Sequence, residues 1–242
     1  MTIRGSLAKI LPYLATMAWA VVAFLAGQAA ALAVLLRWYH GDVEALYAAQ
    51  YDGAVVTLSV LVLNPVIVGV LMFAVRLSGA KPAEYLALVW PPMRTVMAGI
   101  IGIVVIIALT DALLFVSGRA IVSDFQTVSY TTAAAEGWLP LMWIATVLVA
   151  PAGEEILFRG YLFRGFVRSE RSAWPAIIVI SLLWASLHLQ YDWTGMTEIG
   201  VAGLFLGWVR WRSGSTLLTF LLHALFNLEG MLETVAQVKH LF

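Results

Sequence analysis

The stretch LPLMWIATVLVAPAGEEILFRGYLF, residues 139–163, decides the fold, because it is apolar enough to lie in a lipid bilayer and yet contains three ionisable side chains. These are Glu154, Glu155 and Arg159. Ionisable side chains are costly within membrane helices, where they face a protein interior or a wet cavity and mark a functional site by default. The stretch therefore predicts a membrane helix with a polar site inside it.

The composition of the whole chain agrees with a membrane protein. Of its 242 residues, 62% are hydrophobic and 12% are charged, whereas soluble domains average about 25% charged residues. The formal net charge is zero and cysteine is absent, so there is no basic surface for nucleic acid and no thiolate ligand or nucleophile. We expect a single integral membrane domain, 1–242, surrounded by membrane lipids and without a nucleic-acid partner.

Apolar runs predict an all-α, polytopic membrane helical bundle with about seven transmembrane helices, or eight as the alternative. The predicted spans are 10–36, 54–75, 95–117, 138–164, 173–190, 196–211 and 215–232. The N-terminal helices, within residues 1–137, carry no diagnostic motif. Segment 138–230 carries the polar residues and is the predicted catalytic core.

Lysine and arginine alternate between the loops that these spans define. Ten of the 14 basic residues fall on one side and three on the other, and cytoplasmic loops are the ones enriched in Lys and Arg. The ten are Arg4, Lys9, Arg76, Lys81, Arg94, Arg164, Arg168, Arg171, Arg210 and Arg212, and the three are Arg37, Arg119 and Lys239. The N-terminus is therefore predicted to be cytoplasmic.

Helical spacing separates the two glutamates. Residues four apart share one face of a helix, so Glu155 can pair with Arg159, whereas Glu154 points about 100° away. The proline and glycine just before them, Pro151 and Gly153, predict a kink that aims Glu154 inward.

Three more polar residues lie at a similar predicted depth on the later spans. With a rise of about 1.5 Å per residue, His188, His223 and Asn227 share one membrane layer with the glutamates. A carboxylate there can act as a general base on water, and His or Asn can donate hydrogen bonds to a developing oxyanion. The set Glu154, His188, His223 and Asn227 thus permits hydrolysis by an activated water.

Three motifs in this order resemble the CAAX protease and bacteriocin-processing family, also called CPBP or Abi, whose members are intramembrane glutamic proteases and include the type II CAAX prenyl endopeptidases. The motifs read Glu154-Glu155-Ile-Leu-Phe-Arg159, Trp184-Ala-Ser-Leu-His188 and His223-Ala-Leu-Phe-Asn227. Trp184 stands where the family has Phe, which keeps an aromatic wall beside His188.

The resemblance implies a role for each motif residue. Glu154 would activate the water with the help of His188, His223 and Asn227 would form the oxyanion pocket, and Glu155 with Arg159 would shape the site. The implied partner is a peptide or protein substrate, CAAX-like, lipidated or otherwise membrane-associated. The compact chain with short loops resembles prokaryotic members, which implies the cytoplasmic (inner) membrane.

Two alternatives use the same residues. Glu154, His188 and His223 form a normal set of catalytic zinc ligands, although there is no His-Glu-x-x-His helix, and without zinc no cofactor is expected. A membrane scaffold or immunity protein could instead bind a peptide partner without cutting it. Asp111, deep in the third span, has no role in any of these hypotheses.

Overall fold

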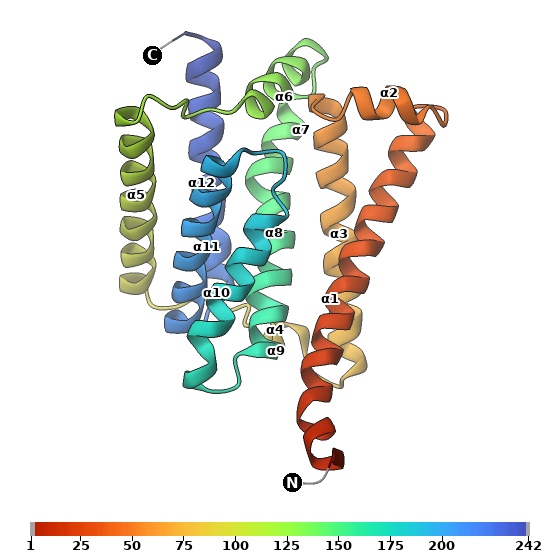
Figure 1. Cartoon of the computed structure of the whole chain (residues 1–242), viewed down its shortest axis with the longest axis vertical. Coiled ribbons are helices and arrows are strands. Elements are labelled where there is room, and N and C mark those ends of the chain that lie inside the picture. Colours follow the sequence, from red (N-terminus) through yellow and green to blue (C-terminus); the bar gives the residue numbers. More distant parts are fainter. Residues whose placement is uncertain (1–2, 241–242) are drawn as a thin grey trace.

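A computed structural model describes residues 3–240 and shows a bundle of long helices (Figure 1). All regular structure within these residues is helical, which confirms the all-α class. The long helices are α1 (Ile3–Trp38), α3 (Gly53–Leu77), α5 (Met93–Val116), α10 (Glu170–Ser186), α11 (Trp193–Ser213) and α12 (Thr216–Val238).

A composite rod, Leu139–Phe166, runs through the middle of the bundle. Its helical register changes four times along its length. The pieces are α7 (Leu139–Ile144), the π-helical η1 (Ala145–Val149), α8 (Ala150–Glu155), the π-helical η2 (Ile156–Leu162) and α9 (Phe163–Phe166). The two glutamates end α8 and therefore lie between the two π-helical segments.

Short helices cross the two ends of the bundle (Figure 1). At the top lie α2 (Val43–Ala48) and α6 (Asp124–Ala135), and at the bottom lies α4 (Pro82–Tyr85). Side chains fix several helix starts, because they accept hydrogen bonds from otherwise unpaired amides. Asp52 accepts from Ala54 N and Val55 N at the start of α3, and Ser123 forms a capping box with Gln126 at the start of α6. These caps hold the ends of the long helices in place.

Four helices are long and apolar enough to cross a membrane: Ile10–Trp38, Gly53–Leu77, Met93–Val116 and Leu139–Phe166. The chain is an integral membrane protein. Helices α10, α11 and α12 run alongside these four in the same bundle (Figure 1). That they also cross, giving seven spans, stays a prediction, as does the cytoplasmic N-terminus.

One predicted span ends earlier than expected. Helix α10 ends at Ser186 rather than near residue 190, and His188 lies in the turn that follows. The amides of Leu187 and His188 bond three residues back, to Trp184 O and Ala185 O, which tightens the last turn and stops the α-helix. The predicted span is therefore four residues too long, and His188 lies two residues beyond the end of the helix and not on it.

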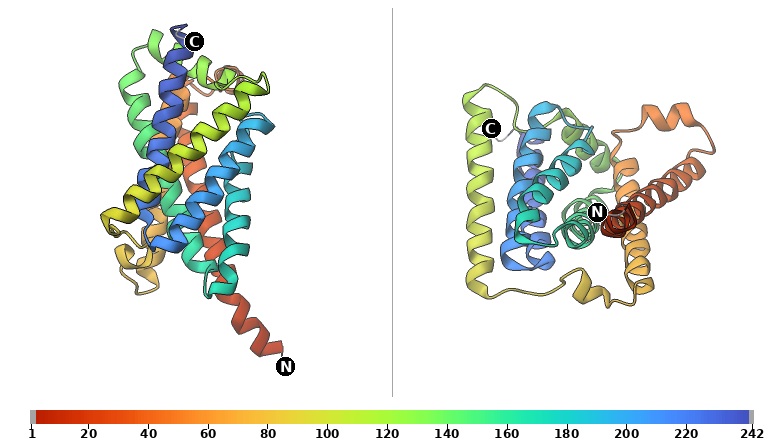
Figure 2. Two further views of the ribbon diagram at one scale, coloured as in Figure 1. Left: turned by 90° about the vertical axis from the view of Figure 1, so that its left-hand side faces the viewer. Right: turned by 60° about the horizontal axis from the view of Figure 1, so that its bottom comes forward.

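The main hydrophobic core surrounds the lower half of the rod. Leu157, Phe158 and Leu162 of η2 pack there with Ile177 of α10 and Leu206 of α11. On one side α1 packs along α3, and on the other α5 contacts α11 and α12; Figure 2 shows α5 at one edge of the bundle. Segment 139–238 thus forms the centre, with earlier helices around it.

Helix α3 touches the rod directly beside the glutamates. Asn64 of α3 is buried, and its side-chain amide donates to Val60 O at 3.2 Å. A Cβ added to Gly153 would lie 2.1 Å from Asn64 Oδ1 and 2.6 Å from Asn64 Cβ. Only a glycine lets the two helices approach this closely, so Gly153 fixes the distance from α3 to the start of the Glu154-Glu155 pair.

Gly153→Ala should therefore destabilise the protein. Overpacking costs about 1–3 kcal/mol, because Asn64 Cβ cannot move without its helix. Gly69→Ala is the matched control, since a Cβ at Gly69 of α3 meets nothing within 4 Å and Ala favours a helix over Gly. Thermal unfolding in detergent should show a lower midpoint for Gly153→Ala alone. Equal midpoints for the two variants would contradict the close contact.

Candidate functional site

The π-helical segment η1 leaves one carbonyl of the rod without a backbone partner. In this register Ala150 N–H donates to Ala145 O, five residues back. The next donor in the series would be residue 151, but Pro151 has no N–H, so Thr146 O is free. Asn227 of α12 supplies the missing donor, with Nδ2 2.8 Å from Thr146 O. The third motif is thereby tied to the rod just above the glutamates.

Glu155 is the anchor of the buried polar cluster. Its Oε1 accepts from Arg159 NH1 at 2.8 Å and lies 2.9 Å from His223 Nδ1. The ion pair with Arg159 confirms the prediction from their spacing. His223 thus bonds to Glu155, and no hydrogen bond joins it to Glu154 within residues 3–240, because the face of the rod that carries Glu155 is the one turned toward α12.

Two arginines link this anchor to α11. Arg159 NH2 donates to Gly203 O at 3.2 Å, and Arg210 Nε donates to Arg159 O at 2.9 Å. Arg210 counts with Arg212 toward the basic residues of the cytoplasmic side, although it lies within the predicted span 196–211. The structure buries Arg210 within α11 at 6% exposure, where the carbonyl of Arg159 is an acceptor for its guanidinium. Its position between Val209 and Trp211 is the sequence signal for this burial.

Glu154 faces a different neighbour. Its Oε2 accepts from Trp184 Nε1 at 2.5 Å, and the carboxylate is half-buried, whereas Glu155 is fully buried. From the sequence, Trp184 is predicted only as an aromatic wall beside His188. Since a buried indole N–H usually finds a hydrogen-bond partner, the replacement of Phe by Trp was itself a signal for this bond.

Trp184 also holds His188. Its Nδ1 lies 2.8 Å from Trp184 O, and the ring centroids of the two side chains are 5.3 Å apart in an edge-on arrangement. The ring of His223 lies 5.0 Å from the Trp184 ring. Trp184 therefore joins three predicted site residues, Glu154, His188 and His223, while Asn227 reaches the rod at Thr146, eight residues before Glu154.

A second polar group lies outside this cluster. Asp111 of α5 and Glu229 and Glu233 of α12 have side-chain oxygens within 4.8 Å of one another. Within residues 3–240 this is the set of His, Asp and Glu whose ligand atoms come so close. Asp111 thus has two acidic neighbours on α12, and neither belongs to the three motifs from which the site was predicted.

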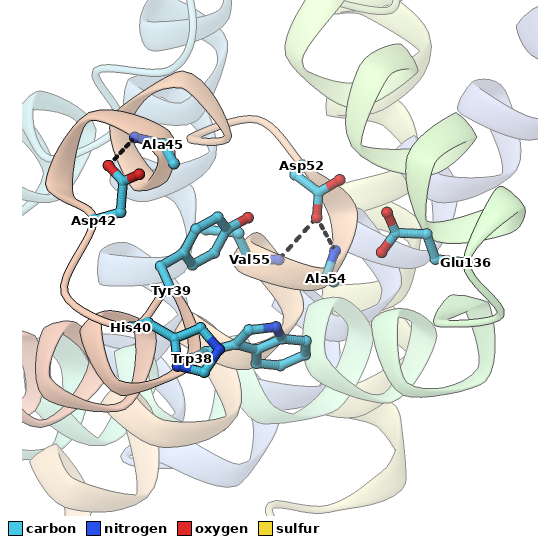
Figure 3. A pocket seen from close by; sticks show the side chains of 9 residues that line it. All are labelled: Trp38, Tyr39, His40, Asp42, Ala45, Asp52, Ala54, Val55 and Glu136. Atoms are coloured by element: carbon cyan, nitrogen blue, oxygen red, sulfur yellow. Dashed lines mark hydrogen bonds between the residues drawn. The ribbon is translucent and has the colours of Figure 1, made fainter.

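A surface cavity of about 380 Å³ lies at the end of the bundle where α1 meets α2 and α3 (Figure 3). Asp42 and Asp52 in its wall are used as helix caps, each accepting backbone N–H groups. Burial raises the pKa of the Tyr39 phenol there, and the nearby carboxylates of Asp52 and Glu136 raise it further. None of the predicted site residues lines this cavity.

Another cavity, of about 340 Å³, adjoins the turn that carries His188. Its wall includes Ser59 of α3, Phe125 of α6 and Leu189 of the turn. A row of aromatic rings connects this wall with the site. The ring centroids of Phe125 and Tyr191 are 5.6 Å apart, and those of Tyr191 and His188 are 6.3 Å apart. This cavity, unlike the first, therefore has residues of the turn that carries His188 in its wall.

The comparisons with known proteins bear on the same part of the chain. Residues 136–228 match the family described as Type II CAAX prenyl endopeptidase Rce1-like. By sequence, this segment belongs to that family. The matched range contains all three motifs, which agrees with the resemblance, and leaves out α1, α3 and α5.

One curated relative is an uncharacterized 24.3 kDa protein from Escherichia coli, which is 35% identical over 95 residues. The match covers 38% of this chain and 43% of the relative, so the chain spans less than half the length of the relative it matches. No solved structure matches the chain.

Arg159→Met should strongly destabilise the protein, because it leaves the Glu155 carboxylate buried without its cation. Breaking a buried ion pair from one side costs about 3–5 kcal/mol. The control is Arg94→Met, which removes an exposed arginine at the start of α5. Thermal unfolding and the yield of monodisperse protein in detergent measure both variants. If Arg159→Met and Arg94→Met had the same thermal midpoint, the ion pair would not be what anchors the buried cluster.

Proposed function

We propose that the protein is an intramembrane endopeptidase that hydrolyses a peptide bond with a water molecule activated by Glu154 and His188. Glu154 takes a proton from the water, whose oxygen forms the new bond to the carbonyl carbon. The C–N bond then breaks, and the proton passes from Glu154 to the leaving nitrogen. No covalent intermediate and no metal is needed, and the family of segment 136–228, one of endopeptidases, supports this reaction class.

The observation that carries the proposal is the way Trp184 holds both groups. A backbone carbonyl only accepts hydrogen bonds, so the bond from His188 to Trp184 O places the proton on Nδ1. The other ring nitrogen, Nε2, is then free to accept a hydrogen bond from water in the neutral ring. Glu154, bonded to the side chain of Trp184, is half-buried, as a base that meets a substrate has to be.

His223 and Asn227 would stabilise the tetrahedral oxyanion. The Nδ1 of His223 is engaged with Glu155, so donation through Nε2 requires the imidazolium form. Asn227 donates one amide hydrogen to Thr146 O, and its second amide hydrogen can be donated to the oxyanion. Removing one such donor costs about 10²–10³ in kcat in a well-studied hydrolase.

The substrate in this proposal is an apolar or lipidated peptide segment attached to the membrane. The cavity beside His188 suits its approach, since Val56, Val60 and Phe125 line it with apolar surface. The aromatic row through Tyr191 continues from that surface to the histidine.

Glu154→Gln should abolish cleavage while the protein stays folded. Loss of a general base costs about 10²–10⁴ in rate, and the amide can still accept the Trp184 N–H. The measurement is mass spectrometry of membrane proteins and secreted peptides from cells with either form, together with purified protein and prenylated or unprenylated CAAX peptides. A fragment that depends on Glu154 is the expected result.

Glu155→Gln is the control variant at the neighbouring residue. It should lower the stability of the protein, because it weakens the buried ion pair with Arg159. Two outcomes would overturn the proposal. Full biological activity of Glu154→Gln and His188→Ala would favour the scaffold or immunity alternative. Activity lost to a chelator and restored by stoichiometric zinc would favour a zinc site made by Glu154, His188 and His223.

Ser59→Trp should raise KM severalfold with kcat little changed, because the indole would fill the cavity beside His188. Ala45→Trp is the control, since Ala45 lines the other cavity, which none of the site residues reaches. Steady-state kinetics on the best peptide substrate compares the two. A higher KM for Ala45→Trp, with Ser59→Trp unaffected, would place substrate approach at the first cavity.

A further inference from the structure

We propose that the indole N–H of Trp184 is a positioning group, which holds the Glu154 carboxylate in the orientation that receives a proton from water. This inference rests on the proposed function for its catalytic consequence. The bond itself can be tested without any substrate.

The side chain of Trp184 has no alternative place for its N–H. It is 1% exposed and is the largest fully buried side chain in the described residues. The Arg159 guanidinium lies over its ring, 4.4 Å from the ring centroid, and the rings of His188 and His223 meet it edge-on. Because leaving a buried donor unpaired is costly, the indole is fixed by packing while its N–H is fixed by Glu154.

Glu154 depends on this donor in turn. Among residues 3–240, Trp184 Nε1 is the hydrogen-bond donor found for the Glu154 carboxylate, at 2.5 Å, and no ion pair forms there. Bonds from N–H to an ionised acceptor are shorter and stronger than neutral ones. One carboxylate oxygen is thus occupied by the indole, and the other is left for water.

The same residue also sets the position of His188. The main-chain oxygen of Trp184 holds His188 Nδ1 at 2.8 Å. The positions of Glu154 and His188 therefore both depend on Trp184. A phenylalanine, which the resembled motif has here, would keep the ring contacts and the cation–π contact. It would have no N–H. The N–H is therefore the feature that packing does not explain.

The bond can be measured by NMR on protein in detergent with ¹⁵N-labelled tryptophan. The chain has ten tryptophans, and Trp184→Phe identifies the Trp184 indole signal by its loss. Glu154→Gln should move that signal upfield, because a neutral amide replaces the carboxylate acceptor, and leave the other indole signals in place. Glu170→Gln, at an exposed residue of α10, is the control. An unmoved Trp184 signal in Glu154→Gln would overturn the inference.

The catalytic consequence is measured by kinetics. Trp184→Phe should lower kcat by roughly tenfold or more, since small misplacements of a catalytic group cost up to about 10²-fold, while KM changes little; its smaller ring also leaves a cavity, which lowers the thermal midpoint. The nearly isosteric analogue 3-benzothienylalanine at position 184, in which sulfur replaces the N–H, should give the same loss of kcat with a thermal midpoint close to that of the wild type. Trp174→Phe, at an exposed residue of α10, is the control and should keep full activity.

The two tests separate the two proposals. If the wild-type protein cleaves nothing, the proposed function fails, while the NMR result still decides whether the indole binds Glu154. If the protein is a protease and the analogue retains full kcat, the positioning role is overturned and the proposed function stands.

Discussion

The fully buried carboxylate of Glu155 binds the guanidinium of Arg159, four residues later on the rod, and the imidazole of His223 from α12, and the rest of the site is built on that arrangement. Arg159 carries the link to α11 through Gly203 O, and His223 carries it to α12. Charges inside a membrane protein are tolerated when they are paired and hydrogen-bonded. The ion pair and the bond from His223 therefore fix how the rod, α11 and α12 sit together, and Glu154 takes no part in these contacts.

The sequence was sufficient to predict the parts of the site that depend on local spacing. The Glu155–Arg159 pair follows from four-residue helical periodicity, and the three motifs predicted which residues would gather. Contacts between distant elements could not be predicted in this way. That His223 bonds to Glu155, and that Asn227 bonds to Thr146 O, depends on the π-helical register of η1, which no periodicity in the sequence reveals.

The same limit applies to the helices. Long apolar surfaces set α1, α3, α5 and the rod apart, whereas α10 has only 17 residues and α11 and α12 carry more polar groups between their apolar ones. The end of α10 could not be predicted for a related reason. Hydrogen bonds to the carbonyl of Trp184 end this helix at Ser186, whereas the apolar run in the sequence continues past that residue.

The two π-helical segments have a consequence for how this chain can vary. Adjacent residues on a helix point about 100° apart. Glu154 and Glu155 are the same residue type, so only their positions along the helix decide which of them faces Trp184 and which faces His223. A deletion of one residue before the glutamates that the wide turn of η1 did not absorb would bring Glu155 to the position beside Trp184 and an isoleucine, Ile156, to the position beside His223. The letters of the first motif would be unchanged, yet the buried anchor would be lost. In this chain, the number of residues before the glutamates and the π-helical turn together decide which carboxylate is buried.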